Sequence, residues 1–99
     1  MKIAFIVHVE YSTARVLEIL DAVGIDYYTR WDQVKGKGQG TDPHLGAGGY
    51  PSTNSVVMIA FRDEQPLADL IAAIEKANAD IKRAADRIRL FQLPLDRIV

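Results

Sequence analysis

The sequence predicts a small α+β fold in which two helices pack on one face of a four-stranded sheet. Three segments, near the start, middle and end of the chain, have the length and the apolar, β-branched composition of strands. Two further segments repeat apolar residues at helical spacing. A mixed segment completes the order strand, helix, strand, strand, helix, strand. The expected fold class is therefore the ferredoxin-like βαββαβ sandwich with a long loop between its second and third strands.

The first half of the chain supplies the first three elements. Residues 2–9 form an almost uninterrupted apolar run, which suits a strand buried on both faces. Ser12 or Thr13 can cap a helix, whose apolar residues recur at helical spacing until Gly24 ends it. Residues 25–34 mix aromatic, threonine and charged residues, as a partly exposed strand does.

The second half supplies the other three elements. Residues 55–61 form an apolar run typical of a central strand, and Pro66 can occupy the first turn of the helix that follows. Residues 88–95 form the last strand. Two helices cover only one face of such a sheet, yet the strands at 2–7 and 56–61 offer apolar residues to both. We expect a second copy of the chain to cover the other face, with a modestly apolar monomer surface as the alternative.

Composition narrows the class of protein. The 99 residues are 48% hydrophobic and 25% charged, which fits a single folded domain over residues 1–99. A formal net charge of −1 argues against the broad basic field of a nucleic-acid-binding protein. The absence of cysteine excludes disulfides, thiolate metal sites and cysteine nucleophiles, and is compatible with a reducing cytoplasm. The N-terminal apolar run is interrupted too soon for a signal peptide.

The segment 35–54 is the most informative part of the chain. It holds all but one of the seven glycines, and it is much longer than the usual connection of about 4–6 residues. Its first six residues alternate glycines with two lysines and a glutamine. Glycines let backbone N–H groups approach a ligand closely, and ammonium groups attract an anion such as phosphate. A plain flexible hairpin tip is the alternative.

The letters QVKGKGQG at positions 33–40 resemble the segment with which the nitrogen regulatory PII signalling proteins enter their long T-loop. The order of elements agrees, as do the Gly24–Ile25 turn and residues 93–95. PII proteins are homotrimers that bind ATP or ADP between subunits, sense metabolites such as 2-oxoglutarate, and control partners through the T-loop. The resemblance implies a cytoplasmic regulator with a T-loop at 35–54 and no required cofactor, with ATP or ADP as an effector. It also implies a regulated partner, such as a membrane transporter or an enzyme.

The same resemblance assigns an effector site. The loop entrance would contact the nucleotide or metabolite, and a threonine of the preceding strand would lie near the base, although its spacing from the loop is one residue longer than usual. An arginine stands where the family has a lysine that contacts phosphate, and its guanidinium can replace that lysine as a bidentate donor. The assigned residues are Thr29, Gly36, Lys37, Gly38, Gln39 and Arg89.

The chain departs from the PII pattern at three places. Residues 78–87 contain no glycine, where the family has a glycine-rich B-loop, and the sequence ends at Val99 without the family's later pair of phosphate-clamping arginines. Ordinary ATP binding is therefore expected to be altered. Tyr50 lies in a different context from the tyrosine that is uridylylated in some PII proteins, so that modification is not expected. A substitute phosphate clamp, or else a solvated basic turn, would be formed by Lys82, Arg83, Arg87 and Arg89.

Metal binding and catalysis are the two other kinds of function to which the sequence could point. Ligand types for a metal occur at His8, Glu10, Asp42 and His44, and resemblance to the similarly folded CutA family makes a metal-responsive protein the alternative function. The alternative to a metal site is that His8 is a hydrogen-bonded histidine of a strand and His44 a solvent-exposed histidine of the loop. For catalysis, the candidate groups Asp42, His44 and Ser52 all lie in one glycine-rich loop, which gives no rigid positioning. We therefore expect that the protein is not an enzyme and that it has no catalytic residues.

Overall fold

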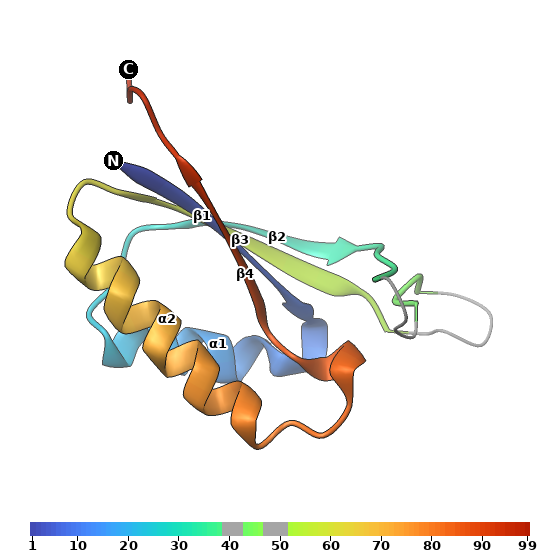
Figure 1. Cartoon of the computed structure of the whole chain (residues 1–99). Coiled ribbons are helices and arrows are strands. Elements are labelled where there is room, and N and C mark those ends of the chain that lie inside the picture. The colour runs from blue at the N-terminus through green and yellow to red at the C-terminus, as the bar shows by residue number, and fades with distance from the viewer. Residues whose placement is uncertain (39–42, 47–51) are drawn as a thin grey trace.

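A computed structural model of the chain describes residues 1–38, 43–46 and 52–99, and it confirms the predicted element order. Two short 3-10 turns, η1 (Glu10–Ser12) and η2 (Ala84–Asp86), join the main elements. All four strands pair antiparallel in the order β2-β3-β1-β4, and both helices cover one face of the sheet (Figure 1). This is the ferredoxin-like fold. The main elements are β1 (Lys2–Val9), α1 (Thr13–Ala22), β2 (Thr29–Val34), β3 (Asn54–Phe61), α2 (Glu64–Ala79) and β4 (Arg89–Pro94).

The core lies between the sheet and the two helices. Side chains alternate between the faces of a strand, so every second residue of β1 and β3 points toward the helices. These residues are almost fully buried, and the apolar stripes of α1 and α2 close over them. The helical spacing that predicted the two helices thus also predicted the faces that they bury. The central core residues are Ala4, Ile6, Val16, Leu20, Val57, Ile59, Phe61, Leu67, Leu70 and Ile74.

The opposite face of the sheet has no helix over it (Figure 1). There the alternate residues of β1 and β3 are only partly buried, so the prediction that residues 2–9 are buried on both faces is wrong within one chain. The strands β2 and β4 leave large apolar side chains in solvent on this sheet: Trp31 is 46% exposed, Phe91 53% and Leu93 48%. The prediction that a second copy covers this face stays a prediction.

The second strand is shorter than predicted. It begins at Thr29, whereas the sequence suggested residue 25. The Ile25 N–H donates to the Leu20 carbonyl at 2.9 Å and the Ile25 side chain is buried, so this residue closes the helix end and does not pair with β3. Gly24 has φ +78°, the left-handed conformation that ends a helix. Tyr27 then packs edge-on against Phe61, with 6.3 Å between the ring centroids.

Residues 80–88 form the turn that leads into β4, and side-chain hydrogen bonds hold it. The Asn78 amide donates to the Ile88 carbonyl at 2.7 Å and accepts from the Ile88 N–H at 2.8 Å. The Tyr11 hydroxyl donates to the Asp86 carboxylate, and this hydrogen bond raises the pKa of Tyr11. Residues 80–88, which contain no glycine, therefore form a turn that these hydrogen bonds hold in place.

In the described part of the chain, no helix is long and apolar enough to cross a membrane.

Candidate functional site

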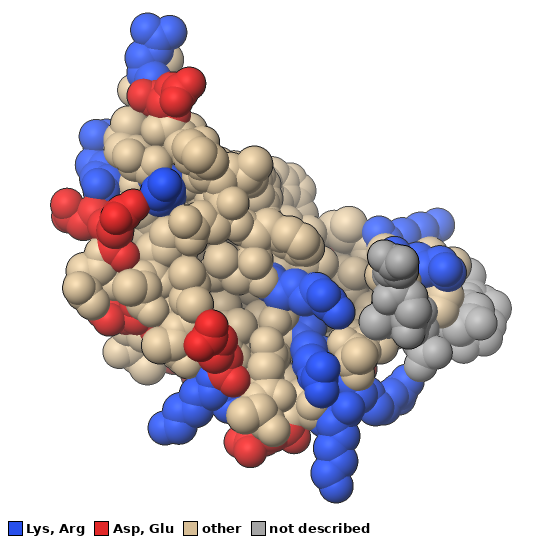
Figure 2. Space-filling view, in the orientation of Figure 1, with Lys and Arg blue, Asp and Glu red and all other residues tan. Residues whose placement is uncertain are grey.

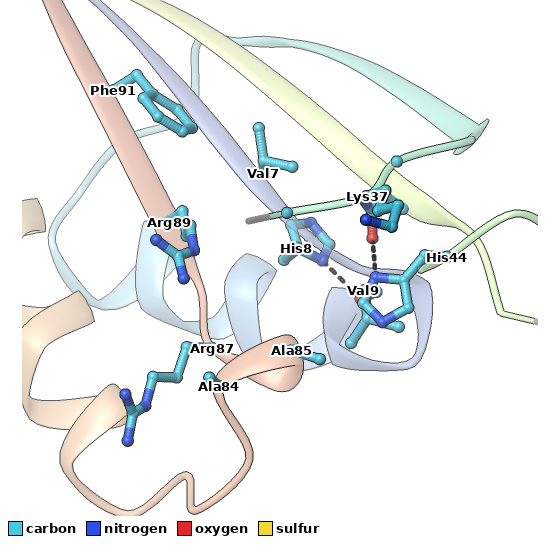
Figure 3. Close-up of a pocket in the computed structure, with 13 residues that line it drawn as sticks. Val7, His8, Val9, Lys37, His44, Ala84, Ala85, Arg87, Arg89 and Phe91 are labelled. Atoms are coloured by element: carbon cyan, nitrogen blue, oxygen red, sulfur yellow. Dashed lines mark hydrogen bonds between the residues drawn. The ribbon is translucent and has the colours of Figure 1, made fainter. Parts of the chain in front are cut away.

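A cavity of about 300 Å³ lies where the loop that follows β2 meets the turn before β4 (Figure 3). We call it the loop-base cavity. Four parts of the chain surround it: the end of β1, the loop entrance with the start of β3, the turn containing η2, and the beginning of β4. The described residues that line it are Val7, His8, Val9, Gly36, Lys37, Gly38, His44, Asn54, Ala84, Ala85, Arg87, Arg89 and Phe91.

Positive charge dominates the loop-base cavity. Lys37, Arg87 and Arg89 line it, and none of its described lining residues is an aspartate or a glutamate. Figure 2 shows Lys and Arg side chains gathered around the turn before β4 and the base of the loop. Arg87 donates from its Nε to the Ile81 carbonyl at 3.3 Å, and its guanidinium points away from the two histidines (Figure 3). Lys37 and Arg89, with no acidic side chain among the described lining residues, suit an anion.

The four basic residues predicted as a substitute clamp do not act together. Arg87 and Arg89 line the loop-base cavity, whereas Lys82 and Arg83 are not among its lining residues. The Arg83 Nε lies 3.9 Å from the Asp86 carboxylate, so it belongs to the outer side of the turn. The pairing of Val7 with Arg89 places Arg89 on the face of the sheet that the helices leave uncovered.

The loop entrance is closed by a backbone pair. The Gly36 N–H donates to the His44 carbonyl at 2.8 Å, and the His44 N–H donates to the Gly36 carbonyl at 2.6 Å. Both backbone polar groups of Gly36 are therefore used within the loop base. Of the other predicted loop-entrance residues, Lys37 and Gly38 line the cavity, and Gln39 lies outside the described residues.

The other predicted site residue, Thr29, does not line the loop-base cavity. It pairs with Met58, well along β3 from the residues that approach the cavity. In this register Thr29, Met58 and Phe5 share the uncovered face of the sheet. Within one chain, the structure therefore brings together Gly36, Lys37, Gly38 and Arg89 and leaves Thr29 apart.

The two histidines line the same cavity in similar states. His8 is 2% exposed and its Nδ1 lies 2.8 Å from the Val9 carbonyl oxygen, while its Nε2 is buried with no partner among the described residues. Burial lowers the pKa of His8, so its imidazole is neutral at pH 7. The Nδ1 of His44 lies 2.7 Å from the Asn54 Oδ1. A ring with Nδ1 held by an acceptor presents an unprotonated Nε2 when neutral.

The described residues contain no group of three or more histidine, aspartate or glutamate side chains that could hold a metal ion. Glu10 accepts a hydrogen bond from the Gln33 N–H and does not line the loop-base cavity. Asp42 lies outside the described residues.

Two asparagines of the site region were not predicted from the sequence. Asn54 orients His44, and Asn78 holds the turn before β4. No local pattern indicates either role, because each partner lies ten residues away and depends on the folded register.

Comparison with known proteins supports the fold assignment. No family model matches the sequence, and no curated protein matches it. Among solved structures, CPII, a nitrogen regulatory PII-like protein from Thiomonas intermedia K12 bound to ADP, AMP and bicarbonate, is 16% identical with a TM-score of 0.64, over 99% of this chain and 94% of that one. CPII bound to ADP and bicarbonate is 16% identical with a TM-score of 0.68, over 97% of this chain and 88% of that one. The chain therefore has the fold of PII-like proteins, and the resemblance inferred from the sequence is confirmed for the fold.

Proposed function

We propose that the protein is a PII-like regulator that binds a small anionic effector, an adenine nucleotide such as ADP, at the loop-base cavity. The observation that carries this proposal is that Lys37 and Arg89 both line one cavity that has no described acidic lining residue. Backbone at Lys37 and Gly38 adds donors suited to phosphate oxygens. Proteins of the same fold have been solved with ADP bound, which agrees with this chemistry.

The effector site is completed between subunits of a homotrimer. Thr29 lies on the uncovered apolar face and outside the cavity, so a single chain does not assemble the whole predicted set. Arg89 lies on that same face. Burial of an apolar sheet face against another copy removes a large association-prone surface from water. A cleft between copies would then hold the effector.

The regulator acts through the T-loop-like segment 35–54 of its single domain and performs no chemistry of its own. Effector binding at the base of the segment favours one arrangement of the loop, and a partner protein that prefers this arrangement binds more tightly. A cytoplasmic regulator of this kind would control a membrane transporter or an enzyme, with no role for nucleic acid.

Calorimetric titration with ADP and ATP tests this function. Lys37→Ala or Arg89→Ala should weaken ADP binding about 10- to 100-fold, the usual loss for a hydrogen bond to a charged group. Lys82→Ala removes one positive charge at a residue that does not line the cavity, so this variant should bind ADP like the parent protein. Equal affinity in all four proteins would refute the assignment of the cavity.

A metal-responsive role is the second candidate function. Each of the two histidines at the loop-base cavity has its Nδ1 at hydrogen-bond distance from an oxygen, an arrangement that is usual for histidines that bind a metal through Nε2. Equilibrium dialysis of the chelator-treated protein with Zn²⁺ or Ni²⁺ tests it. Binding that is lost in both His8→Ala and His44→Ala would support a metal site, and binding that survives both changes would reject it.

A further inference from the structure

His44 lies in the loop-base cavity in a fixed position. Its backbone is paired in both directions with Gly36, and its side chain is 9% exposed. In Figure 3 the ring lies near Lys37, while Arg89 lines the same cavity from the start of β4. A buried polar side chain with fixed backbone and ring is a preorganised contact for a ligand.

The hydrogen bond to Asn54 decides what His44 offers to that ligand. With the Nδ1 proton directed to the Asn54 Oδ1 at 2.7 Å, the neutral ring carries its lone pair at Nε2. No residue that the structure describes makes a hydrogen bond with Nε2 of His44. The corresponding atom of His8 is shielded from solvent, so His44 is the better placed of the two acceptors.

Gly36 preserves this arrangement. A Cβ atom at residue 36 would lie 2.5 Å from the Asn54 Nδ2, which is closer than real Cβ contacts allow. The residue must therefore be glycine for the Asn54 amide to stay against the loop backbone and hold His44. The glycine of the loop-entrance motif thus serves the Asn54–His44 pair, while its own N–H and carbonyl are bonded to the His44 backbone.

We propose that His44 is a specificity-determining residue of the effector site, which accepts a hydrogen bond through Nε2 from an O–H or N–H group of the effector. The inference rests on the proposed function and extends it. Lys37, Arg87 and Arg89 can only donate hydrogen bonds and would hold any phosphate. His44 adds a directional side-chain acceptor, so the site selects an anion that carries a donor group, as a nucleotide does through its ribose or base, over a bare polyanion.

Titration of the chelator-treated full chain with ADP and with pyrophosphate tests this selectivity. His44→Ala should weaken ADP binding about 5- to 100-fold, the range for a buried hydrogen-bonding group that loses its partner, and should leave pyrophosphate binding within about twofold. Arg89→Ala should weaken both ligands. His44→Gln, which keeps an acceptor of similar reach, should recover part of the ADP affinity. Comparison of ADP with 2′-deoxy-ADP and inosine diphosphate then distinguishes a ribose hydroxyl from the adenine amino group as the donor.

The contrary results are distinct. If His44→Ala weakens both ligands equally, or neither, His44 is no acceptor for a donor group and the proposal is overturned while nucleotide binding stands. If the parent protein binds neither ligand, the proposed function fails and this inference fails with it. Nitrogen-15 NMR of the histidine rings in the ligand-free protein tests the same point without a variant. If the neutral imidazole of His44 carries its proton on Nε2 and none on Nδ1, the proposal is also overturned.

Discussion

Replacement of Gly36 by alanine should destabilise the protein because of one side chain, that of Asn54. The new Cβ would lie 2.5 Å from the Asn54 Nδ2, so the amide must shift, and we expect this shift to disrupt its 2.7 Å hydrogen bond with His44. His44 is 9% exposed, so its Nδ1–H would be left largely without water. A buried donor that loses its partner costs about 1–3 kcal/mol. We therefore expect a loss of about 2 kcal/mol in the free energy of unfolding, measured by urea denaturation.

A double-mutant cycle isolates this cause. Gly36 is not one of the described glycines with positive φ, so its backbone accepts alanine without strain. In an Asn54→Ala background the obstacle is gone, and Gly36→Ala should then be neutral or stabilising by about 0.4–1 kcal/mol, because alanine restricts the unfolded chain. An equal loss of stability in both backgrounds would refute the reasoning, since it would place the cost in the backbone and not in the Asn54–His44 pair.

Three further predictions concern stability. Burial lowers the pKa of His8 in the folded protein, so the unfolded chain binds more protons below about pH 6.5. The contribution of neutral His8 to folding stability is therefore complete above that pH and is lost as the pH falls toward the folded pKa. Replacement of His8 by leucine should flatten the fall in urea midpoint between pH 7.5 and 5.5. Asn78→Ala removes two hydrogen bonds to Ile88 and should cost about 1–3 kcal/mol in the free energy of unfolding, and unchanged stability would contradict this assignment. Leu70→Ala empties a fully buried core position and should cost about 2–5 kcal/mol in the same assay, whereas a cost below 1 kcal/mol would mean that Leu70 lies outside the core.

The order of elements could be predicted because each one has a local signal. The apolar runs of β1 and β3 and the stripes of α1 and α2 depend only on periodicity, and Gly24 marks a helix end by its backbone freedom. The start of β2 could not be predicted in this way. Ile25 has a residue type that favours strands, but its N–H donates to the Leu20 carbonyl at the helix end and its side chain is buried in the core. The burial is a tertiary effect, which the local sequence does not reveal.

The candidate site was predicted in part for the same reason. Lys37 and Gly38 belong to a local motif, and Arg89 stands at the start of a predicted strand, so the sequence could single them out. Arg87 was also singled out, as part of a substitute clamp, but its bond to Ile81 depends on the path of the turn before β4. Asn54 acts through the folded register, which no local pattern encodes. Gly36 was singled out as a place where a ligand approaches the backbone, which stays a prediction, and the structure gives it another physical reason: the amide of Asn54 occupies the space of its missing side chain.

Binding of ADP to the parent protein and to the matched pair Arg89→Ala and Lys82→Ala is the most direct test of the central claim. Each change removes one positive charge, but only Arg89 lines the loop-base cavity. We expect saturable ADP binding that Arg89→Ala weakens about 10- to 100-fold and that Lys82→Ala leaves unchanged. No binding of ADP, or equal weakening by both changes, would contradict an effector site at this cavity.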